Sequence, residues 1–213
     1  GSMPPSARDE EIVHHLGHEG FIVDHFDDEP ANRPTAAQMA ATHDLVIVSS
    51  TVTSANIAGE FRTAAVPLIF WESALLSTAR EALASSGAVV SGQTQINIVN
   101  TAHPITQGLP AGNLNIFSPG ANMTVGTGTI AANATVLARR AGSTDVALMT
   151  AEQGASLLSG YIAPARRVFI FLEDASFLAA TPDARSILKR AVCWAGDFAP
   201  SIATPPSPTT TWV

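Results

Sequence analysis

The sequence is short of several residue types, and each shortage excludes a class of protein or site. Cys193 is the only cysteine among 213 residues, so an intrachain disulfide and a multi-cysteine metal site are excluded. Hydrophobic residues make up 46% of the chain, yet no run of about 18 apolar residues occurs, so no membrane span is expected. These features indicate a soluble globular protein.

Basic residues are also few. The chain has 11 Lys and Arg against 18 Asp and Glu, a formal net charge of −7. Its only Arg pairs are Arg139-Arg140 and Arg166-Arg167. A nucleic-acid partner would need a clustered basic stripe, so we expect none.

The two ends of the chain differ in composition from the rest. Gly1-Ser2-Met3 has the form of a scar left by a cleaved tag and is excluded from the fold argument. Residues 199–213, rich in Pro, Thr and Ser, resemble the stiff spacers that join modules of extracellular bacterial proteins. We therefore expect one domain over residues 4–198, excised from a longer, secreted chain, followed by a linker.

Helices and apolar strands alternate in the first half of the chain. A helix is expected from Ser6, with Asp9 completing a capping box, to Gly20. Short apolar runs that suit strands of a parallel sheet come between the helices. The expected strands are residues 21–23, 45–48 and 67–71, and the further helices are residues 35–41, 54–63 and 72–84.

The second half is richer in Gly, Thr and Asn and predicts strands, several of them antiparallel. The last helix has the clearest signals: Thr181 as N-cap, Pro182 in the first turn and Gly196 as the stop. Together these elements predict a three-layer α/β/α sandwich with a flavodoxin-like, mainly parallel sheet and additional antiparallel strands. The strands expected in this half are residues 95–99, 113–117, 135–139, 146–150 and 167–172.

One short motif suggests a family. The segment from His103 to Leu109, His-Pro-Ile-Thr-Gln-Gly-Leu, resembles a signature of ThuA-like proteins, which belong to the class I glutamine-amidotransferase-like superfamily. The order of elements from Ser6 to Gly196 agrees with that fold. Catalytic amidotransferases of the superfamily carry a cysteine in a Gly-x-Cys-x-Gly elbow after a central strand, followed after the last strand by a histidine and a glutamate.

This chain departs from that catalytic pattern. At the elbow it reads Phe70-Trp71-Glu72-Ser73-Ala74, so glutamate replaces the nucleophile and both flanking glycines are absent. Leu172-Glu173-Asp174 follows the last strand without a histidine. A thiol-ester mechanism therefore does not carry over, and Cys193 on the final helix is no substitute.

Five polar residues are candidate ligand-binding residues because most follow strands that should end at one edge of the sheet: Ser50, Glu72, His103, Glu173 and Asp174. Glu72, His103 and Glu173 are also candidates for general acid/base catalysis. Glu72 could equally cap the following helix, and His103, which precedes a proline, could simply fix a turn.

No metal or other cofactor is expected. His14 and His18 stand four residues apart on the first helix, but histidines near a helix C-terminus also interact favourably with its dipole. The acidic loop at residues 24–29 lacks the regular ligand spacing of a calcium loop and suits a solvated turn.

Two functions fit the sequence. The first is a non-catalytic accessory or binding module of a larger secreted bacterial protein, with a carbohydrate or protein partner. The second is a hydrolase or isomerase that acts on a sugar-like substrate with Glu72 and His103 as acid/base groups. Absence of the elbow cysteine favours the first.

A flavodoxin-like domain is expected to begin with an apolar strand, but Pro4-Pro5-Ser6 lead directly into the first helix. An empty strand position would leave ladder groups unpaired and would invite association with another chain. Three arrangements would resolve this: direct pairing of the flanking strands, which we expect because neighbours in sequence usually pair, occupation by residues 209–213, or a strand borrowed from a neighbour.

Overall fold

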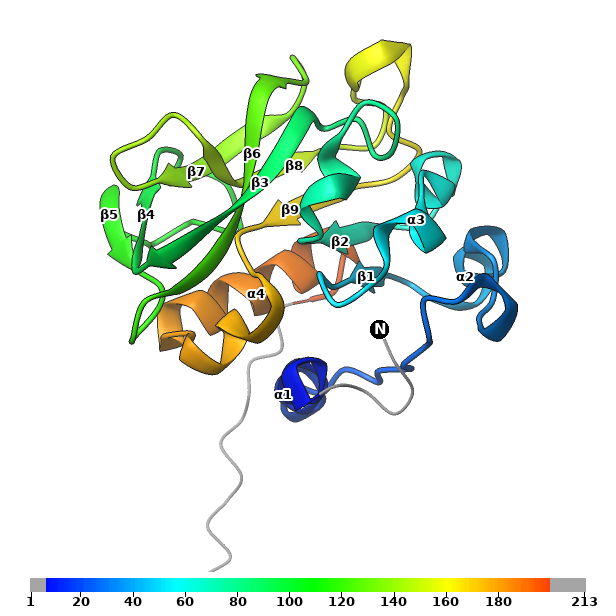
Figure 1. Ribbon diagram of the computed structural model, residues 1–213, viewed down its shortest axis with the longest axis horizontal. Coiled ribbons are helices and arrows are strands. Elements are labelled where there is room, and N and C mark those ends of the chain that lie inside the picture. The colour runs from blue at the N-terminus through cyan, green and yellow to red at the C-terminus, as the bar shows by residue number, and fades with distance from the viewer. Residues whose placement is uncertain (1–6, 200–213) are drawn as a thin grey trace, which may run out of the picture.

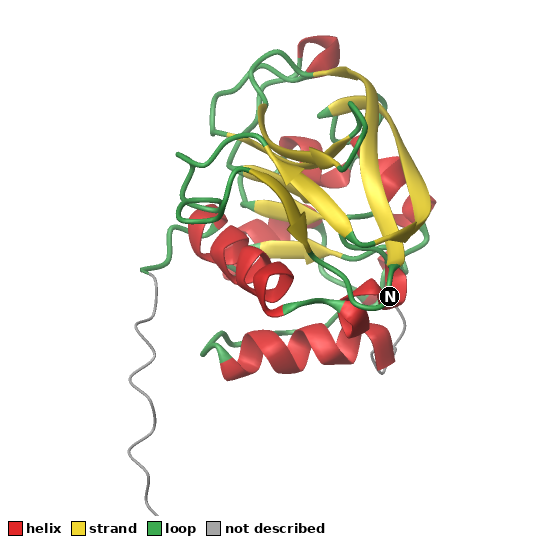
Figure 2. Ribbon diagram, turned by 90° about the vertical axis from the view of Figure 1, so that its left-hand side faces the viewer, coloured by secondary structure: helices red, strands yellow, loops and turns green. Residues whose placement is uncertain are grey.

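A computed structural model describes residues 7–199 of the chain. It forms three layers: one mixed sheet, a pair of long helices on one face, and shorter helices on the other face, as Figures 1 and 2 show. The predicted α/β class and layered, flavodoxin-like arrangement are confirmed. Within residues 7–199, no helix is long and apolar enough to cross a membrane.

The parallel part of the sheet holds three short strands in the order β1-β2-β9. Val46 pairs with Leu68 across β1 and β2, and Leu68 pairs with Arg167 across β2 and β9. β2 and β9 are buried along their whole length, because both faces of this part of the sheet are covered. The bounds are β1 Val46–Val48, β2 Leu68–Phe70 and β9 Arg167–Ile170.

Antiparallel strands extend the sheet beyond β9 in the order β8-β7-β4-β5. Two ten-residue strands, β3 and β6, pair with each other and join the sheet where Gly126 of β6 meets Val146 of β8. The bounds are β3 Ala84–Gln93, β4 Gln95–Ile98, β5 Gly112–Asn115, β6 Ala121–Ile130, β7 Thr135–Arg140 and β8 Val146–Ala151.

Alternate side chains of β2 enter two separate apolar clusters. Ile69 belongs to the cluster beneath α1 (Ala7–His18) and α4 (Pro182–Ala195), the two neighbouring helices below the strands in Figure 2. Leu68 and Phe70 belong to the cluster on the other face, where α2 (Ala36–Thr42), α3 (Ser54–Ile57) and the 3₁₀ helix η2 (Glu60–Thr63) pack. Successive side chains of a strand point to opposite faces of the sheet, so the side chains of β2 that each helix contacts show which face that helix covers.

Capping explains two helix starts that the sequence predicts. Thr35 and Gln38 form a reciprocal capping box at the start of α2. Thr181 accepts a hydrogen bond from the Ala184 N–H, with Pro182 in the first turn of α4.

The helix predicted over residues 72–84 is wrong. Only a 3₁₀ turn, η3 (Ser73–Leu76), follows β2, and β3 already begins at Ala84. Ala82 takes a positive φ of 58°, which no α-helix allows, and the next residues pair with β6. The long-range β3–β6 pairing therefore overrides the local helix propensity.

The strand predicted over residues 21–23 is also wrong. The segment pairs with no strand of residues 7–199, and the Ile22 side chain is 98% exposed. Among the described residues β1 pairs only with β2, so the expected direct pairing across the first-strand position does not occur either. The other two arrangements concern residues outside the described range or a second chain.

Candidate functional site

The parallel strands end at one edge of the sheet, and polar residues follow each of them. Ser50 comes after β1, Glu72 after β2 and Trp71, and Glu173 with Asp174 after β9. Loops at the carboxyl ends of parallel strands are the usual ligand sites of α/β folds. We name these four residues the carboxyl-edge cluster.

Glu72 lies at the junction between β2 and η3, as predicted. Its φ and ψ of −70° and 116° are extended, and its carboxylate accepts a hydrogen bond of 3.0 Å from the Ala74 N–H. Burial raises the pKa of the Glu72 carboxyl, while the Ala74 amide opposes that rise. The side chain therefore caps η3 and is only partly shielded from solvent.

Ser50 contacts Asp174, which directly follows Glu173 in the sequence. The Asp174 N–H donates to Ser50 Oγ at 2.6 Å, and the Glu173 N–H donates to Ser176 Oγ at 2.8 Å. Asp174 has a φ of 30°, in the left-handed region that non-glycine residues adopt only under some strain. This turn begins η5 (Asp174–Ala179) and fixes both carboxylates at the sheet edge.

The two glutamates interact electrostatically. Burial raises the pKa of Glu173, and the neighbouring Asp174 carboxylate and, more weakly, Glu72 add to the rise. A hydrogen bond with the Asn122 side chain and the charge of Arg8 lower it. The carboxyl-edge cluster is thus an acidic, partly buried surface rather than an isolated carboxylate.

α1 adds residues that the sequence argument did not select. Arg8 forms an ion pair with Asp174, and Thr51 Oγ1 donates to the Asp9 carboxylate at 2.6 Å. Asp9 was interpreted only as part of a capping box. Its proximity to Thr51, 42 residues away, has no local sequence signal.

His103 does not join the cluster. Its ring packs at a tilted angle of 59° against Trp194 near the end of α4, with ring centroids 4.8 Å apart, and its Nε2 lies 3.5 Å from Thr150 Oγ1. Both contacts are at the amino end of β9, because Thr150 pairs with Val168 and Arg166 donates to the Trp194 carbonyl. The carboxyl-edge cluster follows the opposite end of that strand.

The local contacts of His103 are those of a turn residue. Its Nδ1 accepts a hydrogen bond of 3.2 Å from the Ile105 N–H, and burial lowers the pKa of the ring. Thr106 is fully buried and donates to the Asn100 carbonyl. The His-Pro-Ile-Thr segment therefore forms a compact turn against β8 and α4.

The structure offers no cysteine near Glu72. Cys193 lies on α4, partly buried, and burial raises the pKa of its thiol, so the thiolate form is disfavoured. Among residues 7–199, no group of three or more His, Cys, Asp and Glu side chains is placed to hold a metal ion.

Comparisons with known proteins agree with this architecture. A cytoplasmic protein of Salmonella typhimurium superposes with a TM-score of 0.57 at 12% identity, covering 86% of this chain and 85% of its own. A protein of Bacteroides uniformis described as ThuA-like gives 0.55 at 12% identity, covering 91% and 88%. The chain has the fold of a ThuA-like protein.

A Thermoplasma acidophilum protein described as a subunit of GMP synthase matches with a TM-score of 0.50 at 12% identity, covering 93% of this chain and 90% of its own. No protein-family model and no curated protein sequence matches the chain. At such low identities the ThuA-like fold is shared, while the activities of these proteins do not transfer.

Proposed function

We propose that this ThuA-like domain is a non-catalytic binding module of a larger secreted bacterial protein, with the carboxyl-edge cluster as its ligand site and a carbohydrate as its ligand. The observation that carries the proposal is Glu72. The sequence resemblance aligns it with the cysteine nucleophile of amidotransferases, and its carboxylate caps η3. The Pro- and Thr-rich composition of residues 199–213 supports the secreted context.

The chemistry of the cluster supports a ligand rich in hydroxyl groups. Ser50, Glu72, Glu173 and Asp174 are all partly exposed, and carboxylate oxygens accept hydrogen bonds from hydroxyl donors. The net charge of −7 and the acidic cluster disfavour a phosphorylated or nucleic-acid ligand. A neutral sugar fits these groups without repulsion.

A glycan-array screen with purified protein tests this proposal. We expect binding to a defined glycan that weakens at least about tenfold in Glu72→Gln and Glu173→Gln, since each substitution removes one charged acceptor but keeps the side-chain shape. The matched control is Glu152→Gln, because Glu152 pairs with Arg166 at the opposite end of the sheet. Absence of glycan binding, or equal weakening by the control, would contradict the proposal.

An acid/base enzyme is the second candidate, and one observation favours it: burial raises the pKa of both Glu72 and Glu173 at the same edge. Such a hydrolase or isomerase would use these two carboxyls, because His103 lies at the other end of β9. Chromogenic glycosides assayed between pH 4 and pH 8 test it. Turnover lost in both Glu→Gln variants would favour this candidate over a binding module.

A further inference from the structure

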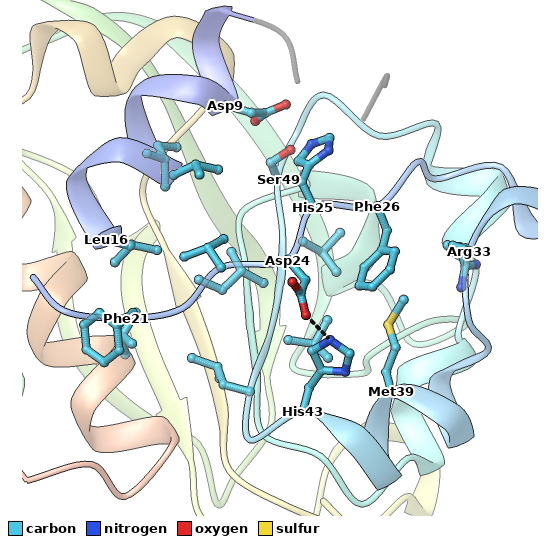
Figure 3. A pocket seen from close by; sticks show the side chains of 18 of the residues that line it. Asp9, Leu16, Phe21, Asp24, His25, Phe26, Arg33, Met39, His43 and Ser49 are labelled. Atoms are coloured by element: carbon cyan, nitrogen blue, oxygen red, sulfur yellow. Dashed lines mark ion pairs between the residues drawn. The ribbon is translucent and has the colours of Figure 1, made fainter. Parts of the chain in front are cut away.

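Among residues 7–199, three strands of the sheet have a neighbour on one side only, and two of these open edges are protected. β5 has only four residues. β1 adjoins a cavity of about 370 Å³ that α1 and residues 21–26 also line. Figure 3 shows Asp24 of this segment paired with His43, shortly before β1, with 3.3 Å between Oδ2 and Nε2. Short length and a covering segment are two ways in which natural proteins keep sheet edges from pairing.

The third open edge belongs to β3, which has neither protection. β3 is ten residues long and pairs with β6 alone in the described part of the chain. Figure 1 shows the two strands side by side. Charged side chains and proline, which blunt many natural edges, are absent from β3. No Asp, Glu, Lys or Arg occurs anywhere between Glu81 and Arg139. The edge of β3 is therefore long and uncharged.

The backbone groups of Val89 in β3 point away from β6. The Thr124 N–H donates to the Phe171 carbonyl at 3.2 Å, so Thr124 directs its backbone groups away from β3. Val89 is the partner of Thr124 in the antiparallel ladder. Opposite residues of such a ladder either exchange both hydrogen bonds or direct both groups outward. The N–H and carbonyl of Val89 therefore face the open edge, as do those of Gly87, and neither residue has a backbone partner on that side within residues 7–199.

The distribution of charge favours a second copy of the chain as the partner of this edge. Each copy carries a formal net charge of −7, so two copies repel each other over most approaches. Contact through β3 brings together a segment that contributes no charged side chain. An uncharged edge also offers no ion pairs that would select a different, charged partner.

We propose that two copies of this chain associate through β3, which pairs with its counterpart in antiparallel orientation about a two-fold axis at Ala88. The β3–β6 ladder is regular from Ser86 to Val90, with register shifts beyond both ends, and Ala88 is the centre of this regular part. About this axis, Gly87 of one copy forms a hydrogen-bonded pair with Val89 of the other, and the symmetry repeats the pair. The Val89 side chain, 48% exposed in one copy, covers the bare backbone of Gly87 in the other.

The proposed ladder is short, so the dimer is weak and depends on concentration. Two residues of each copy face the open edge and form about four hydrogen bonds, over less than the roughly 800 Å² per partner that stable complexes bury. We expect a Kd on the order of 100 μM for the full chain. Sedimentation equilibrium at protein concentrations from about 10 μM to about 1 mM measures this constant.

Amide exchange shows which strand edge the dimer uses. At about 1 mM protein, we expect exchange at Gly87 and Val89 to be at least about threefold slower than at about 10 μM, because the second copy accepts their N–H groups. Ala88 and Val90 direct their N–H groups at β6, so their exchange should be equal at both concentrations.

Paired substitutions separate the edge of β3 from the rest of the surface. Val89→Glu places one carboxylate of each copy close to the axis and should weaken association at least about tenfold. Its matched control is Val99→Glu, because Val99 follows β4, is also 48% exposed and belongs to the same uncharged segment. In a Cys193→Ser background, Ala88→Cys should form a disulfide-linked dimer with glutathione disulfide as the oxidant, whereas Val99→Cys should not.

Three results would overturn the proposal. A monomeric mass at about 1 mM, with equal Val89 exchange at both concentrations, would show that this edge does not accept a second copy. Association that Val89→Glu weakens no more than Val99→Glu does would place the interface elsewhere. Concentration-dependent slowing of exchange at Ile47 or Leu114, in place of Val89, would assign the interface to the edge of β1 or β5.

Discussion

Glu81 and Arg167 form a fully buried charge pair whose net effect on stability can be measured. Both side chains are 0% exposed, and Arg167 Nε lies 3.9 Å from Glu81 Oε2. Neither Glu81 carboxylate oxygen accepts a hydrogen bond from the described residues. The Arg167 guanidinium, in contrast, donates to five backbone carbonyls, those of Phe61, Ala64, Val66, Ala165 and Arg166.

The free energy needed to bury the ionised Glu81 carboxylate exceeds the stabilisation that its charged neighbours provide. Burial raises the pKa of Glu81 from 4.5 to about 7, although Arg167 and Arg62 attract the carboxylate. Burial likewise lowers the pKa of Arg167 to about 10. At about 1.4 kcal/mol per pH unit, the ionised Glu81 carboxylate destabilises the folded protein by roughly 3 kcal/mol at pH 8.

The pH dependence follows from the direction of this shift. Because the folded pKa lies above the unfolded value, the folded protein binds the extra proton between pH 4.5 and 7. The stabilisation from protonated Glu81 is complete below pH 4.5 and is lost as the pH rises through 7. We therefore expect Glu81→Gln to stabilise the protein by about 1–3 kcal/mol at pH 8 and by close to zero at pH 4.5.

Urea denaturation of wild type and Glu81→Gln at four pH values from 4.5 to 8 measures this difference, and other titrating groups cancel in the comparison. Arg167→Met serves as the contrasting variant. It should lose more than about 3 kcal/mol at pH 8, since it leaves a buried carboxylate without its guanidinium partner and removes the guanidinium donor from five carbonyls, of which those of Phe61 and Arg166 keep a backbone N–H donor. Destabilisation by Glu81→Gln at pH 8, or a gain independent of pH, would refute the reasoning.

Two local features give further predictions. Thr181→Ala should lower the free energy of unfolding by about 1 kcal/mol, because it removes the acceptor for the Ala184 N–H, while Thr181→Ser should retain most of it in the same urea assay. Gly87→Ala should cost about 1–3 kcal/mol, since its new Cβ would lie 2.3 Å from the Ser73 carbonyl oxygen. Gly17→Ala, where nothing lies within 4 Å of the added Cβ, is the matched control and should not destabilise the helix.

Elements with strong local signals could be predicted from the sequence. α4 starts at Pro182 after a Thr cap and buries Ile187 and Leu188, as its apolar spacing indicates. β1 and β2 are short apolar runs, and parallel strands buried on both faces are expected to look like this. In each case the residues that decide the element are adjacent in sequence.

Features that depend on distant partners could not be predicted. Residues 84–93 become a strand because β6, some 40 residues later, offers ten residues to pair with, and Gly87 allows η3 to approach. Residues 21–23 have a strand-like composition but lack a neighbour to pair with among residues 7–199. A strand needs a second strand to complete its backbone hydrogen bonds, whereas a well-capped helix forms these hydrogen bonds within itself.

The candidate site divides in the same way. Ser50, Glu72, Glu173 and Asp174 could be placed together because each follows a strand and parallel strands end at one edge. His103 follows β4, which lies among antiparallel strands, so the end of that strand says nothing about the edge reached by β1, β2 and β9. The end of a strand therefore predicts which edge of the sheet a following residue reaches only within the parallel part of the sheet.

The geometry at Glu72 also explains why a restored cysteine should not restore amidotransferase chemistry. Glu72 has ordinary extended backbone angles rather than a strained elbow, and buried Trp71 precedes it. A cysteine there would also be without His103 as its base, because His103 packs against Trp194 at the other end of β9. We expect neither wild type nor Glu72→Cys to release ammonia from glutamine in a coupled dehydrogenase assay. Glutamine-dependent release by wild type that survives Cys193→Ser would show that a different residue supplies the nucleophile.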